Sequence, residues 1–134
     1  MMTELEVLTI QQAAERTGLS EHTLRYYERI GLLGPVERAA NGHRRYRADD
    51  LRLIRFLLML RSTGMPVEQM KAYADLIREG PGNEGARVAL LLEHREQVLA
   101  SIQTLMDNLA VIERKITRYE EIQECRKEDS VPVT

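Results

Sequence analysis

The feature that most constrains this chain is a long stretch near its C-terminal end, residues 84–123, which lacks every strong helix breaker except Gly85. One helix of roughly 60 Å is predicted there, at a rise of about 1.5 Å per residue. Apolar residues recur along it at alternating steps of three and four, which is a heptad seam with Arg95 as its polar member. The apolar members are Val88, Leu91, Val98, Ile102, Leu105, Leu109, Ile112, Ile116 and Tyr119. The residues before this helix cannot bury so long and narrow a stripe, so the pattern predicts a homodimer and leaves open whether the helices run parallel or antiparallel.

The composition allows one small domain with an appended helix. The chain has 134 residues, 43% of them hydrophobic and 30% charged, which is typical of a globular or coiled-coil protein. Its longest apolar runs, residues 56–60 and 88–92, are far too short to span a membrane. The start, MMTELEVLTI, lacks the pattern of a signal peptide, and a single cysteine excludes an internal disulfide. We therefore expect a cytoplasmic protein with no membrane partner.

Two short helices joined by a tight turn are predicted near the N-terminus. Thr9 and Gln12 have the spacing of a capping box, so a helix should begin near Ile10. Gly18 can adopt the positive φ of a turn, and Ser20 is a good cap for the next helix. This order of helix, turn and helix predicts a helix-turn-helix motif.

The second of these helices, predicted within residues 20–33 and closed by Gly31, has two different faces. Leu24 and Tyr27 lie three residues apart and would face inward, with Ile30 continuing their stripe. The opposite face carries basic and aromatic side chains, namely His22, Arg25, Tyr26 and Arg29. We interpret this face as the one that reads DNA.

The segment after this helix predicts a small basic β-hairpin, or wing. Gly34-Pro35 prevents the helix from continuing, and Asn41-Gly42 is a strong hairpin signal between arms at residues 36–38 and 44–47. Alternation along the second arm places Arg44 and Tyr46 on one face, with Arg45 and Arg47 on the other. Such a wing suits phosphates or a minor groove, whereas the plainer alternative is a surface hairpin with solvated arginines.

Two further helices complete the predicted head of the molecule. Asp49 would cap the third helix and Gly64 would end it, and Pro66 suits the first turn of the fourth. Their inward residues would be Leu51, Ile54, Leu58, Val67, Met70, Tyr73, Ala74 and Ile77, and the outward arginines Arg52, Arg55 and Arg61. After a break at residues 80–83, the predicted organisation is a DNA-binding head over 7–80, a dimerisation helix over 84–123 and a flexible tail over 124–134.

The charge is segregated along the chain although its net value is only −2. Seven arginines stand against two aspartates between Arg38 and Arg61, whereas nine basic residues stand against thirteen acidic residues from Ser62 onward. A basic segment in an acidic chain favours a specific nucleic-acid surface over indiscriminate binding, with a solvated basic face as the alternative.

The amino-acid sequence of several segments resembles that of the MerR family of bacterial transcription regulators, over about residues 7–119. The resemblance lies in Ile10 with Ala13-Ala14 and Thr17-Gly18, in the run from Thr23 to Leu33, in Gly42 to Tyr46, and in Gly64-Met65-Pro66. It implies a mainly α fold, with a winged helix-turn-helix head followed by a long helix that pairs antiparallel in a homodimer. It also implies binding to an inverted-repeat promoter element, action by DNA distortion, and RNA polymerase as a partner. We expect no separate ligand-binding domain after the dimer helix.

The same resemblance assigns roles to individual residues. Arg25 and Tyr26 would hold phosphates next to the major groove, and Arg61 would grip the backbone nearer the dyad. His22 and Thr23 are the candidates for base edges. The remaining predicted contacts are Arg29 on the second helix and Arg44, Arg45 and Tyr46 in the wing. Tyr27 is assigned to the core because of its spacing from Leu24.

The effector is not evident from the sequence. Metal-sensing members of the family carry cysteines at the start of the dimer helix and after it, whereas this chain has only Cys125, so no metal or cofactor is expected. Residues 91–95 and 112–116 resemble the branch associated with aldehyde and thiol stress, but Met59 stands near the place of its cysteine. Cys125 is a candidate redox handle, with an unreactive surface thiol as the alternative.

An enzyme is not predicted, because the chain has no glycine-rich phosphate loop, nucleophile elbow or metal triad. The alternative from another class is a dimeric coiled-coil adaptor whose head binds protein. That alternative explains the long helix but not the arginine-rich hairpin beside a helix-turn-helix.

Overall fold

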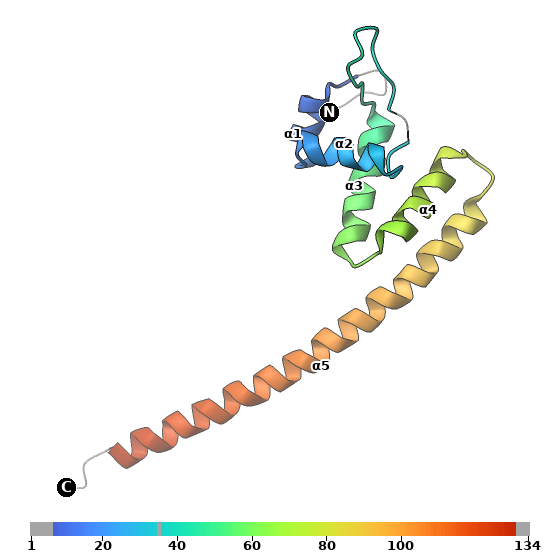
Figure 1. Cartoon of the computed structure of the whole chain (residues 1–134). Helices are drawn as coiled ribbons and strands as arrows, with labels where there is room; N and C mark the ends of the chain where they lie inside the picture. The colour runs from blue at the N-terminus through green and yellow to red at the C-terminus, as the bar shows by residue number, and fades with distance from the viewer. Residues whose placement is uncertain (1–6, 35, 131–134) are drawn as a thin grey trace. The chain divides into compact units, whose positions relative to one another are not determined.

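The computed structural model describes residues 7–34 and 36–130 and is mainly α-helical, as predicted (Figure 1). Its helices are α1 (Ile10–Thr17), α2 (Glu21–Arg29), α3 (Ala48–Ser62), α4 (Val67–Arg78) and α5 (Glu84–Ser130). By internal contacts the chain divides into two units, one ending at His94 and the other beginning at Arg95. The first unit contains the helix-turn-helix, and the second consists of the later turns of α5. No helix among the described residues is both long enough and apolar enough to cross a membrane.

The ends of α1 and the start of α2 are fixed by local hydrogen bonds. Thr9 and Gln12 form the predicted capping box, with bonds of 2.9 and 3.2 Å. Gly18 takes a φ of 77° and donates its N–H to the Ala14 carbonyl, and Ser20 Oγ accepts from the Thr23 N–H at 3.0 Å. These contacts confirm the predicted helix-turn-helix.

Helix α2 ends at Arg29, and Gly31 closes it as predicted. Gly31 has a φ of 82°, which turns the backbone, and the N–H groups of Leu32 and Leu33 both donate to the Tyr27 carbonyl. The turn brings Leu32 and Leu33 back into the core, where both are buried.

The predicted wing is reduced to a loop with isolated bridges. Arg38 pairs with Arg44, and the Asn41-Gly42 turn has the predicted positive φ at Gly42. The backbone of Tyr46 instead exchanges two hydrogen bonds with Leu8, each 2.8 Å long. The two arms are joined by the Arg45 N–H, which donates to the Glu37 carbonyl at 2.7 Å, and by the Ala39 N–H, which donates to the His43 carbonyl at 2.8 Å, but they do not form regular strands.

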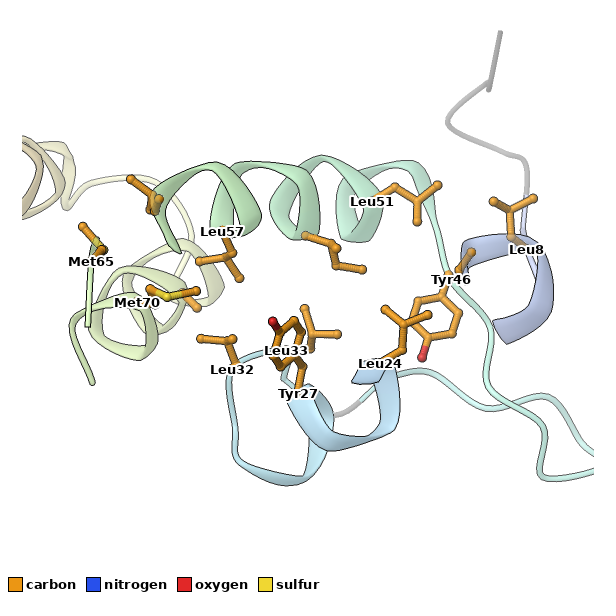
Figure 2. Close-up of a cluster of buried hydrophobic side chains, with 14 residues drawn as sticks. Leu8, Leu24, Tyr27, Leu32, Leu33, Tyr46, Leu51, Leu57, Met65 and Met70 are labelled. Carbon is orange, nitrogen blue, oxygen red and sulfur yellow. The ribbon is translucent and has the colours of Figure 1, made fainter. Parts of the chain in front are cut away.

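The core lies within the first unit and is apolar (Figure 2). Its buried residues are Leu8, Ala13, Leu24, Tyr27, Leu32, Leu33, Tyr46, Leu51, Ile54, Leu57, Leu60, Met65, Met70 and Ala74. Leu24 and Tyr27 face inward as predicted. On α3 the buried stripe runs through Leu57, whereas Leu58 is only partly buried, and on α4 Val67 is exposed.

Helix α3 begins two residues earlier than predicted, at Ala48, and is capped differently. Its flanking residue is Arg47, whose N–H donates to Asp50 Oδ2 at 2.9 Å. Asp50, not Asp49, thus serves the helix start. Burial raises the pKa of the Asp50 carboxyl, and the hydrogen bond from Arg47 opposes this shift.

Helix α5 runs without interruption from Glu84 to Ser130. The predicted flexible tail is therefore wrong for residues 124–130, which are helical, and residues 131–134 lie outside the described part. Arg87, Leu90, Leu91 and His94 follow one helical face and are partly or fully buried within the first unit. In the second unit a stripe of large apolar side chains is exposed, comprising Ile102, Leu105, Leu109, Ile112, Ile116 and Tyr119.

Candidate nucleic-acid interface

The outer face of α2 presents the side chains that the sequence predicted. His22, Arg25, Tyr26 and Arg29 are exposed. The Arg29 guanidinium lies 5.6 Å from the centroid of the Tyr26 ring, which holds the two side chains together. Arg25 pairs with Glu21 at 3.3 Å, and because both are well exposed this pair is weak and can open.

Thr23 contributes to the start of α2 as well as to its surface. Its N–H donates to Ser20 Oγ, and the hydroxyls of the two residues lie 2.9 Å apart. The side chain is partly buried. A base contact by the Thr23 hydroxyl would replace its bond with the Ser20 hydroxyl, while the cap bond from the Thr23 N–H could remain.

Glu28 links α2 to the wing. Its carboxylate lies 2.5 Å from Arg44 Nε and 3.7 Å from an Arg38 nitrogen, and it accepts a hydrogen bond from the Val36 N–H at 3.1 Å. The Glu28 side chain is 13% exposed and that of Arg44 20%. Arg44 is thus held by the protein itself, and sequence reasoning missed this role of Glu28, whose only signal was an acidic residue amid a basic face.

Glu37 likewise forms ion pairs with two arginines of the wing. It lies 2.9 Å from Arg47 and 3.9 Å from Arg45. Arg45 and Arg47 therefore share a face, as the alternation predicted, and this face is open to solvent because the Glu37 side chain is 51% exposed. Both arginines are exposed enough to meet a phosphate.

Tyr46 does not lie on the surface, which corrects its predicted role in the wing. Its side chain is fully buried in the cluster that includes Leu8, Leu24 and Leu51 (Figure 2). Burial raises the pKa of the phenol, and nearby Arg44 partly opposes this. The alternation correctly grouped Tyr46 with Arg44, but that face is directed inward, and the hydroxyl has no hydrogen-bond partner within the described structure.

The arginines of α3 occupy separate places. Arg52 forms an ion pair with Asp49, and Arg55 donates to the Arg16 carbonyl at 3.4 Å, which joins α3 to α1. Arg61 is exposed in the last turn of the helix. Of the three, Arg55 has a structural contact between helices.

A shallow depression of about 410 Å³ lies on the outer face of α2. It is lined by His22, Arg25, Glu28, Arg29 and Arg44. Three guanidinium groups against one carboxylate make this surface electropositive, which suits an anionic backbone. Among the described residues, no group of three His, Cys, Asp or Glu side chains is arranged to hold a metal ion, and Cys125 is exposed.

The fold and this surface define a helix-turn-helix regulator of transcription. The family described as "MerR HTH family regulatory protein" matches residues 8–76, and the chain belongs to this family of regulators, which are not enzymes. The chain is 37% identical over 92 residues to the HTH-type transcriptional regulator AdhR of Bacillus subtilis, a match that covers 69% of this chain and 66% of that protein.

Two solved structures resemble the whole chain closely. A MerR family transcriptional regulator from Listeria monocytogenes has a TM-score of 0.79 and 36% identity, over 92% of this chain and 99% of that one. HiNmlR, a MerR family regulator lacking the sensor domain and solved bound to promoter DNA, has a TM-score of 0.77 and 31% identity, over 89% of this chain and 94% of that one.

Proposed function

We propose that this protein is a homodimeric transcription regulator that binds an inverted-repeat promoter element, one head to each half-site. The observation that carries the proposal is the exposed basic face of α2, in a chain that matches a relative solved on promoter DNA over nearly its whole length. A helix-turn-helix places its second helix in the major groove, where such a face meets phosphates and base edges.

The proposed contacts follow from exposure and charge. Arg25, Tyr26 and Arg29 hold phosphates beside the groove, while His22 and Thr23 meet base edges. Arg45 reaches phosphate from the wing, and Arg61 binds the backbone nearer the dyad. Arg44 contributes positive charge beside the groove from a fixed position, because its ion pair with Glu28 holds its side chain against α2. Tyr46 is left out because it is buried.

The second copy is proposed from the exposed stripe of α5. Leu105 is 68% exposed, and Ile102, Leu109, Ile112, Ile116 and Tyr119 are each about half exposed. A soluble monomer rarely leaves so many large apolar side chains in line, and a second identical helix would cover them. The resemblance to the family favours antiparallel pairing.

Two heads fixed on one dimer would act by bending and untwisting the promoter. Such distortion has an energy that depends on the spacer sequence, and it changes the phase of the elements read by RNA polymerase. Polymerase is accordingly the proposed second partner.

A gel-shift series with the promoter region beside the protein's own gene tests the proposal. The unchanged protein should give a sequence-preferring shift that weakens steeply with salt. Arg25→Ala should lower specific affinity by about tenfold or more, since one charge-assisted phosphate contact is lost, and Arg52→Ala is the matched control on another helix. The absence of any salt-sensitive, sequence-preferring shift would leave the protein-binding adaptor as the better account.

A further inference from the structure

We propose that Arg78 and Arg87 are positioning residues that connect the recognition helix α2 to the first turns of α5 through α4, and thereby set which half-site spacing the dimer accepts. The inference rests on the proposed function. Neither side chain belongs to the basic face of α2, and both bind backbone carbonyls of another element.

Arg78 joins the end of α4 to the exit of α2. One guanidinium nitrogen donates to the Gly31 carbonyl at 3.0 Å, and another donates to the Leu32 carbonyl at 3.3 Å. These carbonyls lie in the turn that follows α2 directly. The same guanidinium forms an ion pair with Asp75 one turn earlier on α4, so its orientation is fixed from both sides.

Gly34 is fitted to this contact. A Cβ added at Gly34 would collide with Cδ of Arg78 and lie 3.1 Å from its Nε. Any residue other than glycine therefore displaces the Arg78 side chain. This position allows the contact to be broken without changing the arginine.

Arg87 makes the corresponding contact between α4 and α5. Its guanidinium donates to the Gly80 carbonyl at 2.6 Å and to the Leu76 carbonyl at 3.3 Å, both at the end of α4. Its Nε also donates to Asn83 Oδ1 at 2.6 Å, and the Asn83 amide donates back to the Leu76 carbonyl at 2.8 Å. The last carbonyls of α4 are thus satisfied by the first turn of α5.

The two arginines form a series of links: the exit of α2, Arg78, α4, Arg87 and then α5. Arg78 binds two carbonyls with different nitrogens of its planar group. Arg87 binds two carbonyls with one terminal nitrogen while its Nε binds Asn83. A lysine cannot reproduce either arrangement with a single ammonium. Loosening either link removes a polar contact in the connection between α5 and the recognition helix, while the packing of Leu90 and Leu91 and the DNA-facing residues of α2 stay unchanged. Variants with a weakened link should therefore keep their affinity for a single half-site but discriminate less between half-site spacings.

Binding to DNA carrying one half-site and to inverted repeats of graded spacing tests this. The unchanged protein should lose about tenfold or more in affinity when the spacing changes by one or two base pairs, because both heads can no longer bind together. Arg78→Lys, Arg87→Lys and Gly34→Ala should reduce that penalty to about threefold or less, and each should bind a single half-site as the unchanged protein does.

Matched controls exist on α3 and α5. Arg52→Lys on α3 changes an arginine that, like Arg78, pairs with an aspartate three residues earlier, and Arg114→Lys changes an exposed arginine of α5 that is not a member of the predicted seam. Both should keep the full spacing penalty. Thermal melting of every variant accompanies the binding measurements, so that a folded population is compared throughout.

The inference is overturned if the folded lysine variants keep the unchanged spacing penalty. It is also overturned if half-site affinity falls as much as full-site affinity, since the arginines would then support only α2 itself. Failure of the proposed function has a different signature, because the unchanged protein would then bind no half-site at all.

Discussion

The first turns of α5 and its later turns carry apolar stripes of the same period and end in opposite environments. Leu90 and Leu91 pack against the core of the head, and His94 is buried with its Nε2 2.8 Å from Thr63 Oγ1. Leu105 and Leu109 are exposed. The period therefore identifies an apolar face but does not identify what covers it. Of the seam that the sequence assigned to a second chain, Leu91 packs on the head instead, whereas Val88 is exposed.

Polar side chains mark the difference between the two segments. The head-facing turns include Arg87 and His94, each with a hydrogen bond to another element. On the exposed stripe, from Ile102 to Tyr119, every member is apolar or aromatic. Polar anchors fix a contact within one chain, whereas an uninterrupted apolar seam suits a second copy.

The largest effect is expected from a charge in the exposed stripe. Leu109→Glu would bury an unpaired carboxylate if two copies met there, so the protein should become monomeric and operator affinity should fall about 100-fold or more. Light scattering after size exclusion measures the mass, and a gel shift measures affinity. Thr104→Glu, an equal charge off the stripe, should change neither. A dimeric Leu109→Glu protein would contradict the proposed seam.

A smaller effect, of another kind, is expected at Leu91. Truncation to alanine should lower the free energy of unfolding by about 1–3 kcal/mol, because the side chain packs against the head core while remaining partly exposed. Urea denaturation followed by circular dichroism measures this. Leu109→Ala should instead weaken association with little change in the head. If Leu91→Ala acted only on association, the head-facing assignment would be wrong.

Most of the fold was predictable because its signals are local. The capping box of Thr9 with Gln12, the positive φ of Gly18 and the cap at Ser20 each depend on residues within one turn, and all three are present. The end of α2 was also indicated locally, because Gly31 can adopt the positive φ of a helix end, and it does. The return of Leu32 and Leu33 into the core after that turn was not indicated by any local pattern.

The candidate site was only partly predictable, because burial depends on distant partners. Alternation correctly placed Tyr46 and Arg44 on one face of the second arm. It could not indicate that the backbone of Tyr46 would pair with Leu8 or that its ring would be buried in the core. Likewise, no short-range pattern indicates that Arg78 reaches the Gly31 carbonyl or that Glu28 holds Arg44. Contacts between residues far apart in sequence were missed, while exposed residues on one helix face were found.

A third test separates the polar anchor from the apolar packing of the head-facing turns. Thr63→Val removes the hydroxyl bound to buried His94 and should lower the free energy of unfolding by about 1–2 kcal/mol, since the imidazole loses its hydrogen bond. Thr104→Val is the matched control, because that hydroxyl donates only to the Ala100 carbonyl on the exposed helix surface. Equal stability of the two variants in urea would show that the Thr63 contact contributes nothing.

The smallest effect is expected at Cys125, which lies on α5 beyond the stripe. Its thiol is exposed and is the only one in the chain, so no second cysteine of the same copy can form a disulfide with it. Cys125→Ser should leave stability within about 0.5 kcal/mol and promoter affinity unchanged, with and without oxidant. A reporter driven by the operator, challenged with peroxide, makes the comparison. If the unchanged protein responded to peroxide and the serine variant did not, Cys125 would be a sensor, and the later turns of α5 would serve in sensing as well as in association.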